Sequence, residues 1–138
     1  MLIRQLRLAL AVIVGVVVAV LLSYAVLIVF LLTTIGIPLG AESRPLTATD
    51  SAILLVAAAV AAAVGARTSA SIARERGRWA VWGVAVILAV MMAWGFSGLN
   101  SWPKGWGIAV AVAMTAGCFL SESIRRWRSS GNAQSLGQ

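Results

Sequence analysis

The sequence has 138 residues, of which 61% are hydrophobic and only 11% are charged, and its net charge is +7. Soluble domains carry about 25% charged residues, so this composition lies outside their range and indicates an all-α integral membrane protein. The positive residues stand at the ends of hydrophobic runs instead of forming one basic face, which argues against nucleic acid as a partner.

Four uncharged runs divide the chain, at residues 8–41, 51–66, 79–103 and 105–121. A helix needs roughly 17 to 25 mostly apolar residues to cross the hydrocarbon core of a bilayer. We therefore predict a single domain over residues 1–129 with four transmembrane helices, at about 6–33, 48–73, 78–97 and 105–128. Residues 130–138 contain too few apolar side chains to fold and are expected to form a disordered tail.

The first run follows two basic residues, Arg4 and Arg7, and so invites comparison with a signal peptide. The apolar core of a signal peptide has only about 7 to 15 residues, whereas this run continues to Leu32, so we interpret it as a retained anchor. At about 1.5 Å per residue, the helix is longer than a hydrocarbon core of about 30 Å and should tilt.

The second helix has a recognisable start. The sequence Thr47-Ala-Thr-Asp50 fits the capping pattern in which a threonine and an acidic residue three positions later satisfy free backbone N–H groups. Asp50 is therefore interpreted as a helix cap and not as a catalytic acid.

Tryptophans lie near the ends of the third and fourth helices, where their rings suit the boundary between lipid and water. Six are predicted to be interfacial anchors: Trp79, Trp82, Trp94, Trp102, Trp106 and Trp127. The short, turn-rich connection at residues 97–105 predicts that these two helices form an antiparallel hairpin, as the first two do. Beyond it, Glu122 is placed to pair with Arg126 one helical turn later.

Nine of the eleven Lys and Arg residues fall at the N-terminus, in the central segment 67–78 or near the C-terminus. Positive residues are preferentially retained in the cytoplasm, so both termini are expected to be cytoplasmic, in the inner (cytoplasmic, or plasma) membrane of a bacterium. Seven arginines would then contact lipid headgroups: Arg67, Arg74, Arg76, Arg78, Arg125, Arg126 and Arg128.

Small residues recur every four positions in each predicted helix, and such stripes let helices approach closely. Examples are Ala11, Gly15, Ala19 and Ser23 in the first helix and Ala57, Ala61 and Gly65 in the second. The longest stripe lies in the fourth helix and gives the predicted helix-packing residues: Gly105, Ala109, Ala113, Gly117 and Ser121.

Few side chains could take part in catalysis or bind a metal ion. The sequence has no histidine and one cysteine, and its four carboxylates fall in connections or at helix ends, so we predict no catalytic residue, no metal site and no cofactor. Cys118 is interpreted as a packing residue. Ser23, Tyr24 and Thr115 are the polar residues at membrane depth, and we expect them to serve contacts between helices.

The predicted function is that of a small non-enzymatic membrane protein, an accessory or structural subunit that packs against other transmembrane subunits or against itself. One alternative is an oligomeric channel, a holin-like pore or a transporter, although no charged residue would line such a pore. A second alternative is a module that binds a quinone or a lipid.

Overall fold

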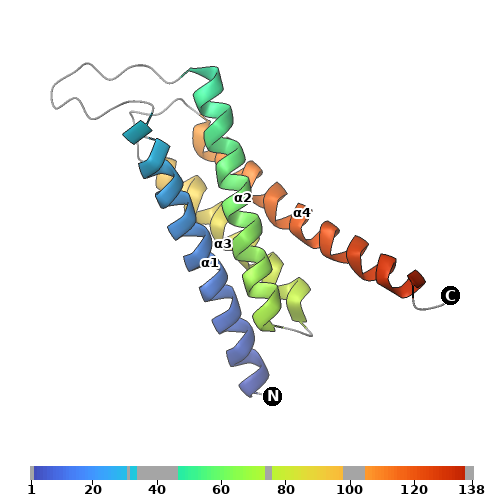
Figure 1. The fold of residues 1–138 in the computed structure, drawn as a ribbon. Coiled ribbons are helices and arrows are strands. Elements are labelled where there is room, and N and C mark those ends of the chain that lie inside the picture. Colours follow the sequence, from blue (N-terminus) through green and yellow to red (C-terminus); the bar gives the residue numbers. More distant parts are fainter. Residues whose placement is uncertain (1, 31, 34–46, 74–75, 98–104, 136–138) are drawn as a thin grey trace.

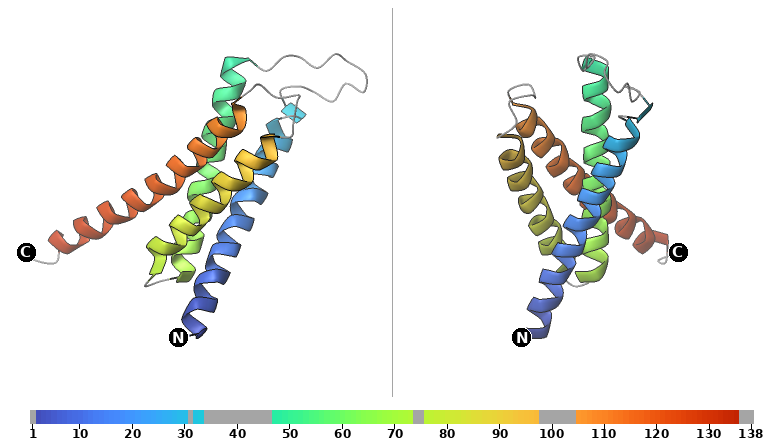
Figure 2. Two further views of the ribbon diagram at one scale, coloured as in Figure 1. Left: turned by 180° about the vertical axis from the view of Figure 1, so that it is seen from behind. Right: turned by 90° about the vertical axis from the view of Figure 1, so that its left-hand side faces the viewer.

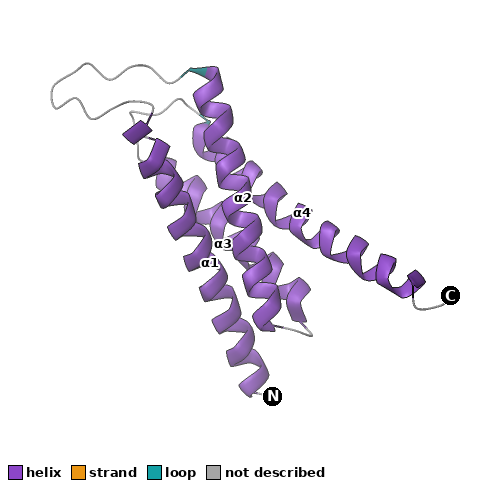
Figure 3. Cartoon of the chain, viewed as in Figure 1, coloured by secondary structure: helices purple, strands orange, loops and turns teal. Residues whose placement is uncertain are grey.

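The computed structural model describes residues 2–30, 32–33, 47–73, 76–97 and 105–135. Their regular structure is helical throughout, and no strand occurs among them (Figure 3). The four α-helices are α1 (Leu2–Phe30), α2 (Ala48–Ala73), α3 (Gly77–Ser97) and α4 (Trp106–Ser135). The prediction of an all-α protein is confirmed.

Each helix contains a segment long and apolar enough to cross a membrane: Ile3–Phe30, Ala48–Ala73, Gly77–Gly95 and Trp106–Trp127. Most residues of these segments point outward, since only 11% of the most apolar stretch of α1 and 33% of that of α3 are buried inside the protein. A bilayer solvates such outward-facing apolar side chains and requires the hydrogen-bonded backbone that a helix provides. The fold therefore indicates a multi-pass membrane protein.

Two helix ends differ from those expected. α1 begins at Leu2 instead of near residue 6, because the first residues include no helix breaker. α4 continues to Ser135 and includes most of the segment 130–138, for which the sequence predicts disorder. Extending an existing helix adds one hydrogen bond per residue without a new nucleation step, so a polar composition alone does not stop it.

The start of α2 is capped as predicted. The backbone N–H and the hydroxyl of Thr47 donate to Asp50 Oδ2 at 2.9 and 2.7 Å, and the backbone N–H of Asp50 donates to Thr47 Oγ1 at 3.2 Å. These reciprocal bonds satisfy polar groups that the first turn of a helix cannot satisfy internally.

α2 occupies the centre of the bundle and packs against each of the other three helices (Figure 1). α3 also packs against α1 and α4. Near the end of α2, Arg7 of α1 donates from Nε to the carbonyl oxygen of Ile72 at 3.1 Å. The C-terminal half of α4 leaves the other helices and projects from the bundle in every view (Figure 2).

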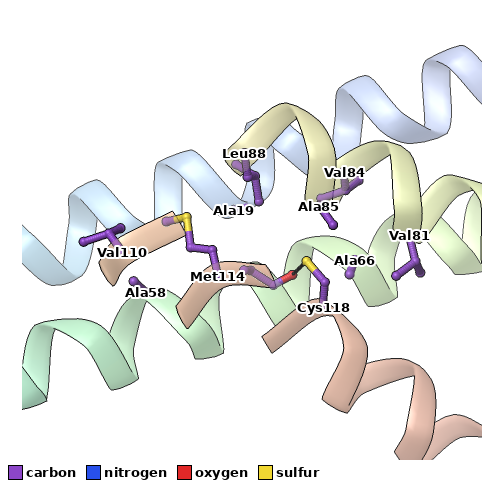
Figure 4. Packing of buried hydrophobic residues seen from close by; sticks show 11 residues of the cluster. Ala19, Ala58, Ala66, Val81, Val84, Ala85, Leu88, Val110, Met114 and Cys118 are labelled. Atoms are coloured by element: carbon purple, nitrogen blue, oxygen red, sulfur yellow. Dashed lines mark hydrogen bonds between the residues drawn. The ribbon is translucent and has the colours of Figure 1, made fainter. Parts of the chain in front are cut away.

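The core is built from small residues with a few larger side chains between them (Figure 4). Leu88, Met114 and Val84 are the largest fully buried apolar side chains, and most remaining core positions are alanines. Lipid tails are as apolar as these residues, so close van der Waals packing, and not the hydrophobic effect, must hold such helices together.

Candidate functional site

The five residues of the predicted packing stripe of α4 differ in burial. Gly117 is buried, and a Cβ built on it would overlap the carbonyl oxygen of Ala59 and lie 3.0 Å from its Cα. The buried apolar side chains of α4 are instead Val110, Met114 and Cys118, which lie outside the stripe. Their spacing of four residues, with Gly117 three after Met114, keeps them on one side of the helix.

Gly105 makes no close helix contact with the described part of the chain. It precedes the first residue of α4 with φ +90°, a backbone conformation that favours glycine, and its carbonyl accepts the N–H of Ala109 at 3.0 Å. Among the described atoms, none lies within 4 Å of a Cβ built at this position. Ala109, Ala113 and Ser121 are only half-buried.

A four-residue stripe as long as the one predicted for α4 drifts off one face of the helix, because α-helices have 3.6 residues per turn. Each step of four residues overshoots a full turn by about 40°, so four steps carry the stripe about 160° around the helix. The first and last members of the predicted stripe therefore cannot both face α2.

Cys118 links α4 to α2. Its thiol is fully buried and donates to the carbonyl oxygen of Ala62, with Sγ 3.7 Å from that oxygen (Figure 4). The thiol thus lies within a packed contact between two helices, as its interpretation as a packing residue requires.

The hydroxyls expected to join helices bond within their own helix. Ser23 Oγ donates to the carbonyl of Ala19 at 2.8 Å, and Thr115 Oγ1 donates to the carbonyl of Ala111 at 2.7 Å. Tyr24 is 59% exposed. The two smaller hydroxyls therefore bond the backbone of their own helices, because a carbonyl one turn back lies within close reach.

The buried hydroxyl that sequence reasoning missed is Ser69 on α2. It is fully buried, and its Oγ has no hydrogen-bond partner among the described residues. Its Cβ would lie 2.7 Å from a Cβ built on Gly15 of α1, so the small side chain serves close packing between α1 and α2. The only signal in the sequence was its place four residues after Gly65.

The tryptophans occupy different environments. Trp79, Trp94 and Trp127 are 70%, 82% and 80% exposed. Trp82 instead packs edge-on against Phe119 of α4, with ring centroids 4.8 Å apart and an interplanar angle of 76°. Trp106 is half-buried, and Trp102 lies outside the described residues.

Five of the seven predicted headgroup-contacting arginines have described side chains, and all five are exposed: Arg67, Arg76, Arg78, Arg125 and Arg126. Arg74 and the side chain of Arg128 lie outside the description.

The predicted pair of Glu122 and Arg126 is present, with Arg126 Nε 3.3 Å from Glu122 Oε1. The structure adds Arg125, which forms a two-pronged contact with the same carboxylate. Its Nε lies 2.9 Å from Oε2 and its Nη2 lies 2.8 Å from Oε1. Arginine and carboxylate are geometrically matched for such a contact, which fixes both groups.

An apolar cavity of about 320 Å³ lies between the helices, beside the later part of α1 and the start of α4. All four helices contribute to its lining, which includes Val20, Tyr24, Leu54, Met92, Trp106 and Met114. A cavity of this size and lining suits a hydrocarbon chain or another apolar group.

A second cavity, of about 340 Å³, lies among the last turns of α2, the start of α3 and the later part of α4. Its lining includes charged groups, namely Arg67, Glu122 and Arg125, together with Ser71, Val81 and Ile124. The two cavities thus differ in chemistry, one being apolar and the other charged.

Comparison of the chain with protein-family models, curated proteins and solved structures finds no match. Within the described residues, no three His, Cys, Asp or Glu side chains are grouped so that they could hold a metal ion.

Proposed function

We propose that this chain is a non-catalytic multi-pass membrane protein that acts as an accessory subunit of a larger membrane assembly. The observation that carries the proposal is the exposure of small residues near the end of α3. Ala93 and Gly95 are exposed there, on different sides of the helix, and no described atom lies within 4 Å of a Cβ built on Gly95. Exposed small residues allow a helix of another subunit to approach closely.

The hydrogen bonds formed by the polar side chains at membrane depth also support a structural role. The hydroxyls of Ser23 and Thr115 and the thiol of Cys118 each donate to a backbone carbonyl. A side chain held in this way stabilises its helix or a helix contact and is not poised as an activated nucleophile beside a base.

For the orientation in the membrane, we infer two antiparallel hairpins, α1 with α2 and α3 with α4, and both termini in the cytoplasm. The contact of Arg7 with Ile72 supports the first hairpin, and the contact of Trp82 with Phe119 supports the second. The distribution of Lys and Arg supports the cytoplasmic side, and we propose the inner membrane as the location.

Labelling with a membrane-impermeant thiol reagent tests the orientation. Cysteines are introduced singly at Ser43 and at Ser129, with the parent protein, whose Cys118 is buried, as the control. We expect Ser43→Cys to react in intact cells and Ser129→Cys to react only after the cells are opened. The reverse pattern would overturn the proposed topology.

Purification in mild detergent tests the accessory role. Ala93→Leu adds a bulky side chain at one of these exposed positions of α3 and should release copurifying membrane subunits without changing the melting temperature. Ala116→Leu is the matched control, because Ala116 is an exposed alanine on α4. Unchanged copurification in Ala93→Leu, or a wild-type protein that purifies with no other subunit, would contradict the proposal.

The apolar cavity favours a second candidate, the binding of a lipid tail or a quinone. Ala57 lines this cavity, whereas Ala52 is an exposed alanine of the same helix that does not. We expect Ala57→Phe to fill the space and to lower the amount of lipid or quinone extracted from washed protein, as measured by mass spectrometry. Ala52→Phe should leave that amount unchanged, and equal loss in both variants would exclude the cavity as the site.

A further inference from the structure

The charged cavity joins three helices that are far apart in the sequence. Arg67 and Ser71 come from the last turns of α2, Val81 from the start of α3, and Glu122 and Arg125 from α4. Its two arginines enter from different helices. Such a cavity exists only where the helices come together, at the end of the bundle where α2 finishes and α3 begins.

Glu122 holds the arginine on the α4 side in place. Its side chain is 9% exposed, and both of its oxygens accept hydrogen bonds from Arg125. Oε1 also accepts a bond from Arg126. Both oxygens of the carboxylate therefore accept hydrogen bonds from arginine. The guanidinium of Arg125 donates only two of its five N–H groups to this carboxylate.

The balance of charge favours an anionic ligand. Arg67 lines the cavity from α2 and Arg125 from α4, while Glu122 is the one acidic residue among the described residues of the lining. Because Glu122 also binds Arg126, two guanidinium groups share its carboxylate, and Arg67 adds a further positive charge to the cavity. Guanidinium groups bind phosphate through paired N–H donors, so a phosphate group suits the remaining positive charge.

Apolar groups border the same cavity. Ala70 and Val81 are part of its lining, and Ile124, which is 51% exposed, lies beside the charged residues. A free phosphate ion would gain nothing from these side chains, whereas a lipid would place its acyl chains along them. Basic pockets between transmembrane helices are known to suit anionic lipid headgroups.

We propose that this cavity binds a phosphate group carried by an anionic lipid of the surrounding leaflet. Arg67 and Arg125 are its phosphate ligands, and Glu122 is a positioning residue that orients Arg125. The proposal goes beyond general attraction between arginines and a charged membrane, since it assigns one site with ligands from two helices. It does not depend on the accessory role proposed above.

Titration of the full chain in mild detergent, with lipid binding followed by native mass spectrometry, tests the site. The probes are phosphatidylglycerol, which is anionic, and phosphatidylcholine, which has no net charge. Arg67→Gln should weaken phosphatidylglycerol binding about tenfold or more, because it removes a charged hydrogen-bond donor, and should leave phosphatidylcholine binding unchanged.

Arg78→Gln is the matched control. Arg78 is an exposed arginine near the start of α3 that does not line the cavity. Its loss removes the same charge from the same end of the bundle and should weaken phosphatidylglycerol binding about fivefold or less, the effect of surface charge alone. Equal weakening in the two variants would overturn the proposed site.

Glu122→Gln separates positioning from simple charge attraction by the sign of its effect. If charge alone attracted the lipid, removing a carboxylate would strengthen phosphatidylglycerol binding. If Glu122 orients Arg125, its replacement should weaken that binding, because an amide offers Arg125 only one acceptor oxygen. Stronger phosphatidylglycerol binding in Glu122→Gln would overturn the positioning role. If Glu122→Gln lowers the melting temperature, its weaker binding could reflect a damaged fold, and the Arg67→Gln variant then tests the site.

Inorganic phosphate distinguishes the two sources of a phosphate group. At millimolar concentration it should fail to displace phosphatidylglycerol from the wild-type protein, since it lacks the acyl chains that contact Ile124. Displacement of the lipid by inorganic phosphate would overturn the assignment to a lipid.

Discussion

Gly15 of α1 and Gly65 of α2 face each other so closely that neither position has room for a Cβ atom. A Cβ on Gly15 would lie 2.8 Å from the carbonyl oxygen of Gly65, and a Cβ on Gly65 would overlap the carbonyl oxygen of Gly15 and lie 2.8 Å from Ala19 Cβ. Ala11 and Ala19 flank Gly15 and are fully buried. This contact lets two membrane helices pack backbone against backbone.

Gly65→Ala is expected to destabilise the bundle by about 1 to 3 kcal/mol, because the added methyl group must push α1 and α2 apart. Gly95→Ala is the matched control, since its Cβ would meet no described atom within 4 Å. Alanine is the better helix former by up to about 1 kcal/mol, so Gly95→Ala should be neutral or stabilising. Reversible unfolding in mixed micelles measures the unfolding free energy of both variants. Equal losses of stability in the two variants would contradict the close contact.

Met114→Ala tests the contact face of α4. Met114 is 1% exposed, whereas Leu120 on the same helix is 60% exposed. Removing the buried side chain leaves a cavity and should cost on the order of 2 kcal/mol of unfolding free energy. Leu120→Ala should cost much less, because lipid can fill the vacated space. If Leu120→Ala proved the more damaging change, the face assigned to α4 would be wrong.

Thr47→Val tests the cap of α2. Valine has a similar shape but cannot accept the N–H of Asp50 or donate to its carboxylate, so stability should fall by about 1 kcal/mol. Thr49→Val is the control, because Thr49 is an exposed threonine in the first turn of the same helix. Thermal unfolding in detergent compares the two, and an equal change in melting temperature would speak against the capping bonds.

Ser23→Ala and Thr115→Val test the structural interpretation of the hydroxyls. Each hydroxyl donates to a carbonyl of its own helix, which the helix already uses, so each substitution should change stability by about 0.5 kcal/mol or less. Copurification with partner subunits should also persist. A variant that lost function in its host assembly while keeping its stability would instead indicate a ligand-binding role for that hydroxyl.

The sequence by itself determined the features that depend on neighbours along the chain. Hydropathy and length are properties of a single segment, so four membrane-spanning helices could be predicted from composition. The cap formed by Thr47 and Asp50 and the pair formed by Glu122 and Arg126 each lie within one helical turn. Backbone geometry brings such residues together whatever the rest of the fold does.

The tertiary structure alone decided which small residues meet another helix. Every helix carries small-residue stripes, and the longest, on α4, contributes only Gly117 as a buried residue. The stripe of α1 proved the better contact face, with Ala11, Gly15 and Ala19 all buried. A stripe of small residues indicates which side of a helix permits close approach. The angle and position at which two helices cross determine which of these residues lie in the contact.

The two cavities and their chemistry were likewise decided by the tertiary structure. Arg67 and Arg125 are distant in sequence and carry no local signal that they line one site, and the sequence placed both only among the residues facing lipid headgroups. They line one cavity because α2 and α4 pack together before the end of α4 leaves the bundle. Local physical chemistry fixes each helix and its charges, whereas packing between helices determines which charges share a space.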